Sequence, residues 1–246
     1  MSRMEILPAI DLLGGKCVRL IQGRYDRVIE YEDDPLKVAE RMRAEGARWL
    51  HVIDLDGARD GAVFNFDALR RLASTGMRIQ FGGGVRSEES ISAALDAGAE
   101  RVIIGTRALE EPRWLDETSR RPEFSGRLAL GLDARQGRLV TRGWTRETGQ
   151  TAAEIAEHVT DWPLAAIVYT DVGRDGTLLG PNIEAIRGLA AISHVPVIAS
   201  GGVSDLEDVR TLARLPLAGV VIGRALYEQT VRLGEALAIS ASQPVT

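Results

Sequence analysis

The sequence predicts a single α/β domain folded as a (βα)8 barrel, or TIM barrel, built from two similar half-barrels. Three observations lead to this expectation: a length of 246 residues, eight short aliphatic runs separated by amphipathic stretches, and motifs that recur half a chain apart. Single barrels of this kind commonly have about 250 residues. We therefore expect one domain over residues 1–246, with a frayed tail at 240–246.

The expected barrel strands are short runs of aliphatic and β-branched residues without polar alternation. Parallel strands that are buried on both faces need such continuous hydrophobicity. The runs lie at 6–10, 49–53, 79–81, 101–104, 128–132, 166–169, 197–199 and 219–222. Because both faces of the sheet must be covered, helices are expected on the outside.

The segments between the runs carry signals for helix starts and stops. Asp34-Pro35 and Gly46 bracket the first expected helix. Two pairs have the spacing of a capping box and predict the starts of the fifth and seventh helices: Thr151 with Glu154, and Ser204 with Glu207. Pro181-Asn182 precedes apolar residues at helical spacing, which predicts the sixth helix.

The two halves of the chain carry the same motifs in the same order. Two glycine motifs recur: Phe81-Gly-Gly-Gly-Val85 as Ser200-Gly-Gly-Val203, and Ile103-Ile-Gly105 as Val221-Ile-Gly223. The segment Asp11-Leu-Leu-Gly-Gly-Lys-Cys-Val18 is repeated as Asp133-Ala-Arg-Gln-Gly-Arg-Leu-Val140. Arg59-Asp-Gly61 is repeated as Arg174-Asp-Gly176. A repeat period near half the chain favours a duplicated half-barrel over a solenoid.

Composition excludes several classes of protein. A hydrophobic share of 45% is enough for a substantial core, and the net charge of -5 argues against a nucleic-acid partner. No apolar run is long enough to span a membrane, and the N-terminus lacks a signal peptide. The single cysteine, Cys17, has no partner within the chain. We expect a cytoplasmic, soluble monomer without an obligatory protein partner.

Asp11 and Asp133 are the candidate reactive groups. They follow the first and fifth expected strands at equivalent points of the repeat, so they should face each other at the carboxyl end of the barrel, where such enzymes place their chemistry. A carboxyl group beside an apolar wall can act as base or acid near neutral pH. One isolated Asp would as readily cap a loop, but two equivalent ones favour proton transfer.

Four glycine motifs predict two phosphate sites. Gly83-Gly84 and Gly201-Gly202 leave backbone amides unshielded where a helix begins, and Gly105-Thr106 and Gly223-Arg224 follow the next strands. A lone Gly-Gly pair is more often a tight turn than a ligand site. Because the motifs recur as a set, we expect a substrate with two phosphates.

Three other residues are candidates for substrate contacts. Trp144 follows Asp133 and either stacks on a planar heterocycle or shelters in an apolar cluster of its own loop. Thr170 and Asp175 follow the sixth expected strand, from which they can hydrogen-bond a sugar.

No metal site is expected. Asp54 and Asp56 have only His51 close by, without an ordered spacing of ligands. Cys17 is interpreted as structural, and the chain has neither a nucleophile elbow nor a dinucleotide fingerprint.

At its longest motifs the chain resembles a known family, the ProFAR isomerases of histidine biosynthesis, where ProFAR is phosphoribosyl-formimino-aminoimidazole carboxamide ribotide. The resemblance covers residues 5 to 240. The motifs that carry it are Pro8-Ala-Ile-Asp-Leu-Leu-Gly-Gly-Lys-Cys-Val-Arg-Leu-Ile-Gln-Gly23, Asp54-Leu-Asp-Gly-Ala58, Gly143-Trp144 and Thr170-Asp-Val-Gly-Arg-Asp-Gly-Thr177.

The resemblance implies an Amadori rearrangement of an aminoaldose to an aminoketose, without a cofactor. It implies Asp11 as the base and Asp133 as the acid, with Asp175 as a rival acid and Thr170 positioning the sugar. The full set of expected substrate contacts is Arg19, Gly83, Gly84, Gly105, Thr106, Trp144, Thr170, Asp175, Gly176, Gly201, Gly202, Gly223 and Arg224.

Three alternative functions compete with this one. The related cyclase subunit of imidazole glycerol phosphate synthase usually has Cys-Leu-Asp where this chain has Ala9-Ile-Asp11. The bifunctional isomerase that also serves tryptophan synthesis shares Arg142-Gly143-Trp144, so that motif does not discriminate, whereas residues 22–27 look more like the single-pathway enzymes. A non-catalytic phosphosugar-binding barrel would be expected to have lost one of the two carboxylates.

Overall fold

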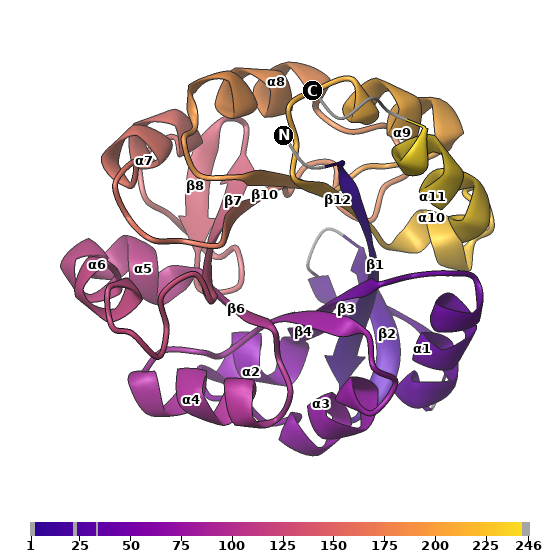
Figure 1. The fold of residues 1–246 in the computed structure, drawn as a ribbon, viewed down its shortest axis with the longest axis horizontal. Coiled ribbons are helices and arrows are strands. Elements are labelled where there is room, and N and C mark those ends of the chain that lie inside the picture. Colours follow the sequence, from indigo (N-terminus) through magenta and orange to yellow (C-terminus); the bar gives the residue numbers. More distant parts are fainter. Residues whose placement is uncertain (1–2, 22–23, 33, 243–246) are drawn as a thin grey trace.

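The computed structural model describes residues 3–21, 24–32 and 34–242, and it shows a closed barrel of parallel strands surrounded by helices (Figure 1). The barrel strands are β1 (Glu5–Leu13), β4 (Trp49–Asp54), β5 (Arg78–Gly82), β6 (Arg101–Ile104), β7 (Leu128–Arg135), β10 (Ala166–Asp171), β11 (Val197–Ser200) and β12 (Gly219–Ile222). They pair in this order, and the ring closes where β12 pairs with β1. The predicted fold class and all eight predicted strands are confirmed.

Two barrel strands continue into antiparallel hairpins at equivalent places of the two halves. β1 pairs with β2 (Lys16–Ile21) and β7 with β8 (Arg138–Thr141), so that Asp11 faces Val18 and Asp133 faces Val140 in the ladders. Each connecting turn has two central residues at positive φ, Gly14-Gly15 and Gln136-Gly137, as tight hairpin turns require. The two aspartates therefore lie inside strands, and the expectation that they follow the strand ends is wrong.

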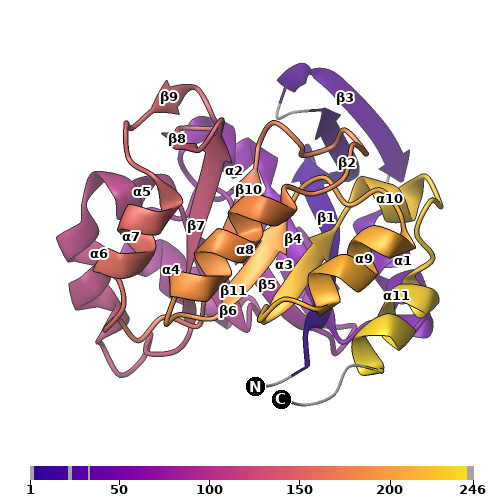
Figure 2. The same cartoon turned by 90° about the horizontal axis from the view of Figure 1, so that it is seen from above.

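Each hairpin is extended by one more strand at the same end of the barrel. β3 (Arg24–Glu32) pairs with β2, and β9 (Arg146–Glu147) pairs with β8. Figure 2 shows both extensions rising from one edge of the molecule, where they flank the opening of the barrel. Neither extension was predicted. Residues 22 and 23, part of the segment that favours the single-pathway enzymes, lie outside the described residues.

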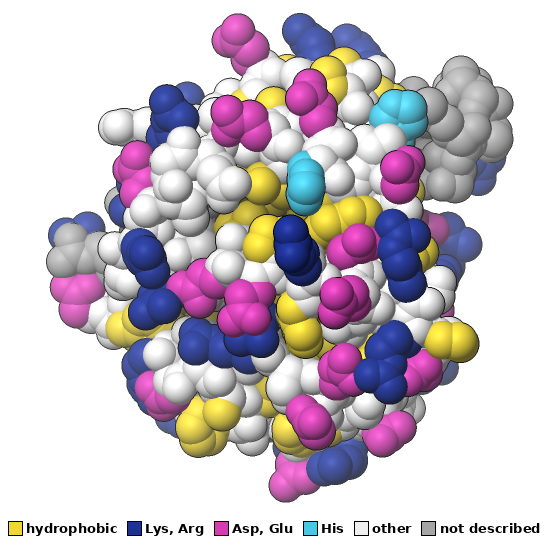
Figure 3. Space-filling view, turned by 90° about the vertical axis from the view of Figure 1, so that its left-hand side faces the viewer, with side chains coloured by type: hydrophobic (Ala, Val, Ile, Leu, Met, Phe, Trp, Pro, Cys, Tyr) yellow, Lys and Arg dark blue, Asp and Glu magenta, His cyan; other side chains and the backbone are white. Residues whose placement is uncertain are grey.

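The helices cover the outside of the barrel. They are α1 (Pro35–Ala44), α2 (Leu55–Asp60), α3 (Phe66–Ala73), α4 (Glu88–Asp96), α5 (Thr106–Glu110), α6 (Pro112–Ser119), α7 (Ala152–His158), α8 (Ile183–Ile192), α9 (Leu206–Ala213), α10 (Arg224–Tyr227) and α11 (Leu233–Ala241). Within the described ranges, none is long and apolar enough to cross a membrane. Acidic and basic side chains alternate on the face that Figure 3 shows.

Three of the four predicted helix starts are confirmed. Asp34 caps α1, Thr151 forms the predicted capping box of α7, and Asn182 caps α8. The capping box at Ser204 is wrong, because Asp205 caps α9 instead. Its carboxylate accepts the amide hydrogens of Glu207 and Asp208 at 2.9 and 3.0 Å, and a charged acceptor outcompetes a hydroxyl for them.

The predicted frayed tail does not begin at residue 240. Ser240 is buried in the last turn of α11, and its hydroxyl donates a hydrogen bond to the backbone carbonyl of Met4. This bond joins the last helix to the start of the first strand. Residues 243–246, the rest of the expected tail, lie outside the described part of the chain.

The core has an inner and an outer layer. The outer layer packs between strands and helices, whereas the inner one fills the barrel with Leu7, Ala9, Trp49, Ala129, Ala166, Val168, Ile198 and Val221. Trp49 starts β4, and the guanidinium groups of Arg78 and Arg101 lie 4.2 and 4.1 Å from its ring centroid. The amino-terminal end of the barrel is thus filled.

We expect Trp49→Ala to lower the free energy of unfolding by about 3–5 kcal/mol, because a large side chain would be lost from a filled interior. Denaturant unfolding measures this difference. Phe64→Ala is the matched control, because that ring is 60% exposed, and it should change stability by less than about 0.5 kcal/mol. Equal losses in both variants would contradict the filled interior.

Candidate active site

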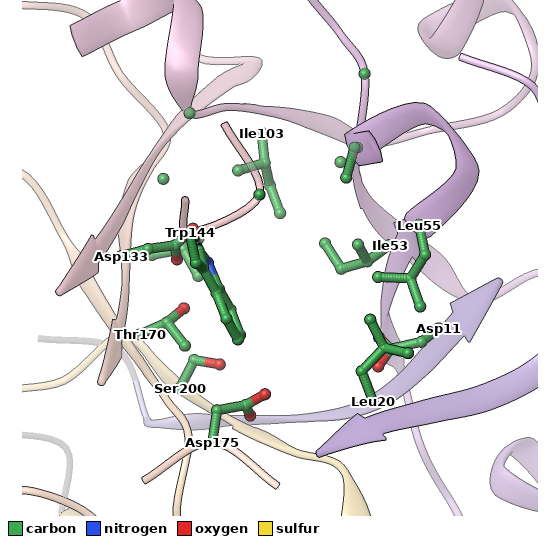
Figure 4. A pocket seen from close by; sticks show the side chains of 18 of the residues that line it. Asp11, Leu20, Ile53, Leu55, Ile103, Asp133, Trp144, Thr170, Asp175 and Ser200 are labelled. Carbon is green, nitrogen blue, oxygen red and sulfur yellow. Dashed lines mark hydrogen bonds between the residues drawn. The ribbon is translucent and has the colours of Figure 1, made fainter. Parts of the chain in front are cut away.

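A cavity of about 210 Å³ opens at the carboxyl ends of the barrel strands. In Figure 4, Asp11 lies on one side of it with Leu20 and Leu55, and Asp133, Thr170 and Ser200 lie across from it. The structure therefore brings the two predicted reactive aspartates to opposite walls of one cavity. Between them the floor is mostly apolar and includes Ile53, Ile103, Val168 and Val221.

Arg19 connects Asp11 to Asp175. One guanidinium nitrogen of Arg19 donates to Oδ2 of Asp11 at 2.9 Å, and the other terminal nitrogen donates to Asp175. The guanidinium lies against Gly223, where a Cβ atom would come within 2.9 Å of it. The glycine that was predicted to bind phosphate thus also makes room for this arginine.

The carboxyl group of Asp11 has a raised pKa. Burial raises it because water no longer stabilises the charge, and the nearby charge of Asp175 adds to the rise. The guanidinium of Arg19 opposes both effects without cancelling them. The result is a charge-paired carboxylate that is more basic than an exposed one.

The pKa of Asp133 is also raised, but the groups that affect it differ from those around Asp11. Burial raises it, while neutral hydrogen bonds from Trp144 and Thr170 lower it in part. The indole nitrogen of Trp144 donates to Oδ2 of Asp133 at 2.8 Å. Since no cation contributes to the shift, Asp133 is better suited to hold a proton than Asp11 is.

The loop that carries Trp144 is held in an unusual backbone conformation. Arg142, Gly143 and Trp144 all have positive φ, at 55°, 61° and 67°, which side chains other than glycine rarely adopt. The amide of Arg142 donates to the Thr106 hydroxyl at 2.9 Å, and its side chain donates to Glu110 at 2.8 Å. These contacts with α5 hold the turn, and the indole extends into the cavity in Figure 4.

The glycine motifs form two cradles on two sides of the barrel opening. The first cradle lines the main cavity and consists of Gly83, Gly84, Gly105 and Thr106. The second cradle lines a second cavity of about 20 Å³ and consists of Gly176, Gly201, Gly202, Gly223 and Arg224. Arg19, Asp175 and Ser200 line both cavities and join them.

The cradle glycines are also required by the packing of the backbone. A Cβ atom on Gly83 would lie 2.1 Å from the carbonyl oxygen of Asp54, and one on Gly202 would lie 2.6 Å from that of Gly180. Both glycines have positive φ. These contacts agree with the tight-turn interpretation, and phosphate binding by the same glycines stays a prediction.

Sequence reasoning missed several side chains of the cavity. Arg86, Tyr25 and His51 line it. The half-chain repeat gives no signal for Arg86, because the equivalent residue in the second half is Ser204. His51 was weighed only as a metal ligand, although its place in a buried strand directs it into the barrel.

Two other polar residues considered above have structural partners. The carboxylate of Asp54 accepts hydrogen bonds from the backbone amides of Gly57, Phe64 and Asn65. The buried thiol of Cys17 lies 3.2 Å from the hydroxyl of Tyr227. Asp54 thus fixes the segment that follows β4, and the contact of Cys17 joins β2 to α10.

Comparison with known proteins identifies the family. The family model described as "Histidine biosynthesis protein" matches residues 5–232. The chain belongs to this family. Among its members, proteins named 1-(5-phosphoribosyl)-5-((5-phosphoribosylamino)methylideneamino)imidazole-4-carboxamide isomerase are similar to it: 47% identity over 235 residues in Synechococcus sp. (strain RCC307) and 46% over 238 residues in Synechocystis sp.. Each alignment covers 95% of this chain and 92% of the relative.

We expect Asp133→Asn to raise the free energy of unfolding at pH 7, because an amide carries no charge to bury. An Asp with a raised folded-state pKa destabilises the folded protein above that pKa, and the cost disappears as the pH falls below the unfolded value. Urea unfolding at pH 7 and at lower pH measures the difference, which should shrink on acidification.

Asp11→Asn is the matched control for this prediction. It removes a second buried carboxylate but also breaks the ion pair with Arg19. The free energy of unfolding should therefore rise less than in Asp133→Asn, or fall. A destabilised Asp133→Asn variant at pH 7 would contradict the cost assigned to burial.

Proposed function

We propose that this protein is a ProFAR isomerase, which converts the aminoaldose ProFAR to the corresponding aminoketose, PRFAR, in histidine biosynthesis. The observation that carries the proposal is the pair of buried carboxyl groups, Asp11 and Asp133, on opposite walls of a cavity with a glycine cradle on each side. The name of the relatives at 46 and 47% identity supports the same activity.

Asp11 is the base and Asp133 the acid in this proposal. Asp11 is paired with a guanidinium, which favours its charged form, and it can then accept a proton. Asp133 is buried without a cation beside it, and burial raises its pKa, which suits a carboxylic acid that holds a proton. The rival acid Asp175 is engaged by Arg19 as an ion pair, so the proposal gives it the role of positioning Arg19.

The reaction then follows three steps. Asp133 protonates the ring oxygen of the aminosugar, and the ring opens to an iminium. Asp11 removes the proton on C2, and the electron pair of that bond forms the C1–C2 double bond of a neutral enolamine. The enolamine becomes the ketone when C1 gains a proton and the C2 hydroxyl loses one. Both carboxyl groups end as they began once these protons are returned.

The substrate contacts follow from the lining of the two cavities. The amides of the two cradles bind the two phosphates, assisted by Arg86 in the main cavity and Arg224 in the second. Trp144 stacks on the imidazole ring, and Thr170 positions the sugar beside Asp133. Because one chain supplies both carboxyl groups and both cradles, the proposal includes a single-domain monomer that needs no partner. We also propose that it acts in the cytoplasm.

Purified protein should convert ProFAR to PRFAR without added metal or nucleotide. Asp11→Asn and Asp133→Asn should each lower kcat by at least about 100-fold, and Asp175→Asn by less, since loss of acid or base costs about 10²–10⁴-fold. Absorbance of the product measures the rate. A wild-type protein without turnover would refute the function; an active Asp133→Asn variant would transfer the acid role to Asp175.

The rate should depend on pH as a bell with both limbs set by aspartates. As the pH falls through the raised pKa of Asp11, the base is protonated and kcat/KM declines; as it rises through the raised pKa of Asp133, the acid loses its proton and kcat/KM declines again. Steady-state kinetics across pH measures both limbs. A Trp144→Phe variant should shift the alkaline limb upward, because a hydrogen bond that lowers the pKa of Asp133 is lost.

A further inference from the structure

His51 is a buried polar group in an apolar part of the cavity floor. It lies in β4, is 6% exposed, and lines the cavity together with Ile53 from the same strand and Ile103 from β6. In the sheet it pairs with Ala9 of β1 on one side and with Gln80 of β5 on the other.

Gln80 determines which nitrogen of His51 carries the proton. The side-chain nitrogen of Gln80 lies 2.8 Å from Nδ1 of His51, and Gln80 is fully buried. With this amide donating, Nδ1 accepts and the ring proton sits on Nε2. The amide oxygen of Gln80 has no partner among the described residues. The reversed amide would leave a buried NH2 group with two unpaired donors, which costs more.

The ring of His51 is uncharged. The pKa of His51 is lowered to about 3, mainly by burial and also by the positive charges of Arg19 and Arg101. Above that pH the imidazole therefore presents a neutral Nε2–H group. No hydrogen bond is recorded for Nε2 within the described residues, and the ring borders the cavity.

We infer that His51 is a further catalytic residue, which donates its Nε2–H to the C2 oxygen of the bound sugar; this inference rests on the proposed function. β4 lies next to β1, with Ile53 beside Asp11 and His51 beside Ala9. His51 is thus adjacent to the proposed base and one layer deeper. The carbon that loses its proton to Asp11 carries this oxygen, which changes from hydroxyl to carbonyl during the reaction.

A neutral donor suits that oxygen for two reasons. A fixed N–H group in apolar surroundings stabilises charge that builds up on oxygen, and it needs no reorganisation at the moment of reaction. A neutral imidazole also does not transfer its proton readily, so it leaves the proton transfers to the two aspartates. A charged histidine would instead lower the basicity of Asp11 beside it.

The protonation state of His51 can be measured without any turnover. The chain has three histidines, so 15N-histidine labelling with His51→Gln as the assignment variant isolates its signals. We expect an unprotonated Nδ1 and a protonated Nε2, unchanged between about pH 5 and 9. In the Asp11→Asn protein, adding ProFAR should move the Nε2–H proton resonance downfield. A proton on Nδ1, or no response to ProFAR, would overturn the inference.

Kinetics test the role in the reaction. We expect His51→Leu to lower kcat by about 100-fold with little change in KM, as for the loss of one donor to a reacting oxygen, and His51→Gln to recover at least about tenfold of that loss by restoring a neutral N–H. Gln80→Glu should also lower kcat, because a carboxylate would draw the ring proton to Nδ1.

Two controls separate the possible failures. His194→Gln changes an exposed histidine and should leave kcat unchanged, and thermal unfolding should show all variants folded. Wild-type protein that does not convert ProFAR would refute the proposed function. If the wild type turns over and the kcat of His51→Leu lies within about threefold of the wild-type value, only the role of His51 is refuted. A threefold loss is far below the loss expected for a donor to the reacting oxygen.

Discussion

The ion pairs of Arg19 hold together the open end of the barrel. Its guanidinium joins the first hairpin, the segment that follows β10, and the start of α10, which are far apart in the sequence. Two carboxylates as close as Asp11 and Asp175 would repel each other in a buried site, and the shared cation makes their common burial possible. The position of Asp11 in the cavity, and the division between the two cavities, both depend on it.

The same arginine makes two equivalent aspartates chemically different. Asp11 and Asp133 occupy the same place in two hairpins of the same design, but the residue that corresponds to Arg19 in the second hairpin is Thr141. Asp133 therefore has no cation and is hydrogen-bonded by Trp144 instead. In the proposed reaction this one difference separates a base from an acid, although both carboxyl groups are raised in pKa by burial.

The parts of the structure that the sequence predicted are those in which local pattern and fold agree. Buried parallel strands leave apolar runs, and close backbone contacts at Gly83 and Gly202 leave glycines that no other residue can replace. The hairpin extensions β3 and β9 were not predicted, because they lie outside the barrel and are rich in charged residues. The pairing of Arg19 with Asp175, 156 residues apart, and that of His51 with Gln80 exist only after the ring of strands has closed.

In the proposed reaction, a barrel made of two equal halves would bind a substrate with two phosphates in either direction, and only one direction would place C2 beside Asp11. The halves differ in their arginines. Arg86 of the first cradle corresponds to Ser204, whereas Arg224 of the second corresponds to Thr106, so each cradle has one arginine but at a different corner. Arg19 also lies against Gly223 of the second cradle. These differences give the two cradles different shapes and charges, which in the proposed reaction would favour one orientation of the substrate.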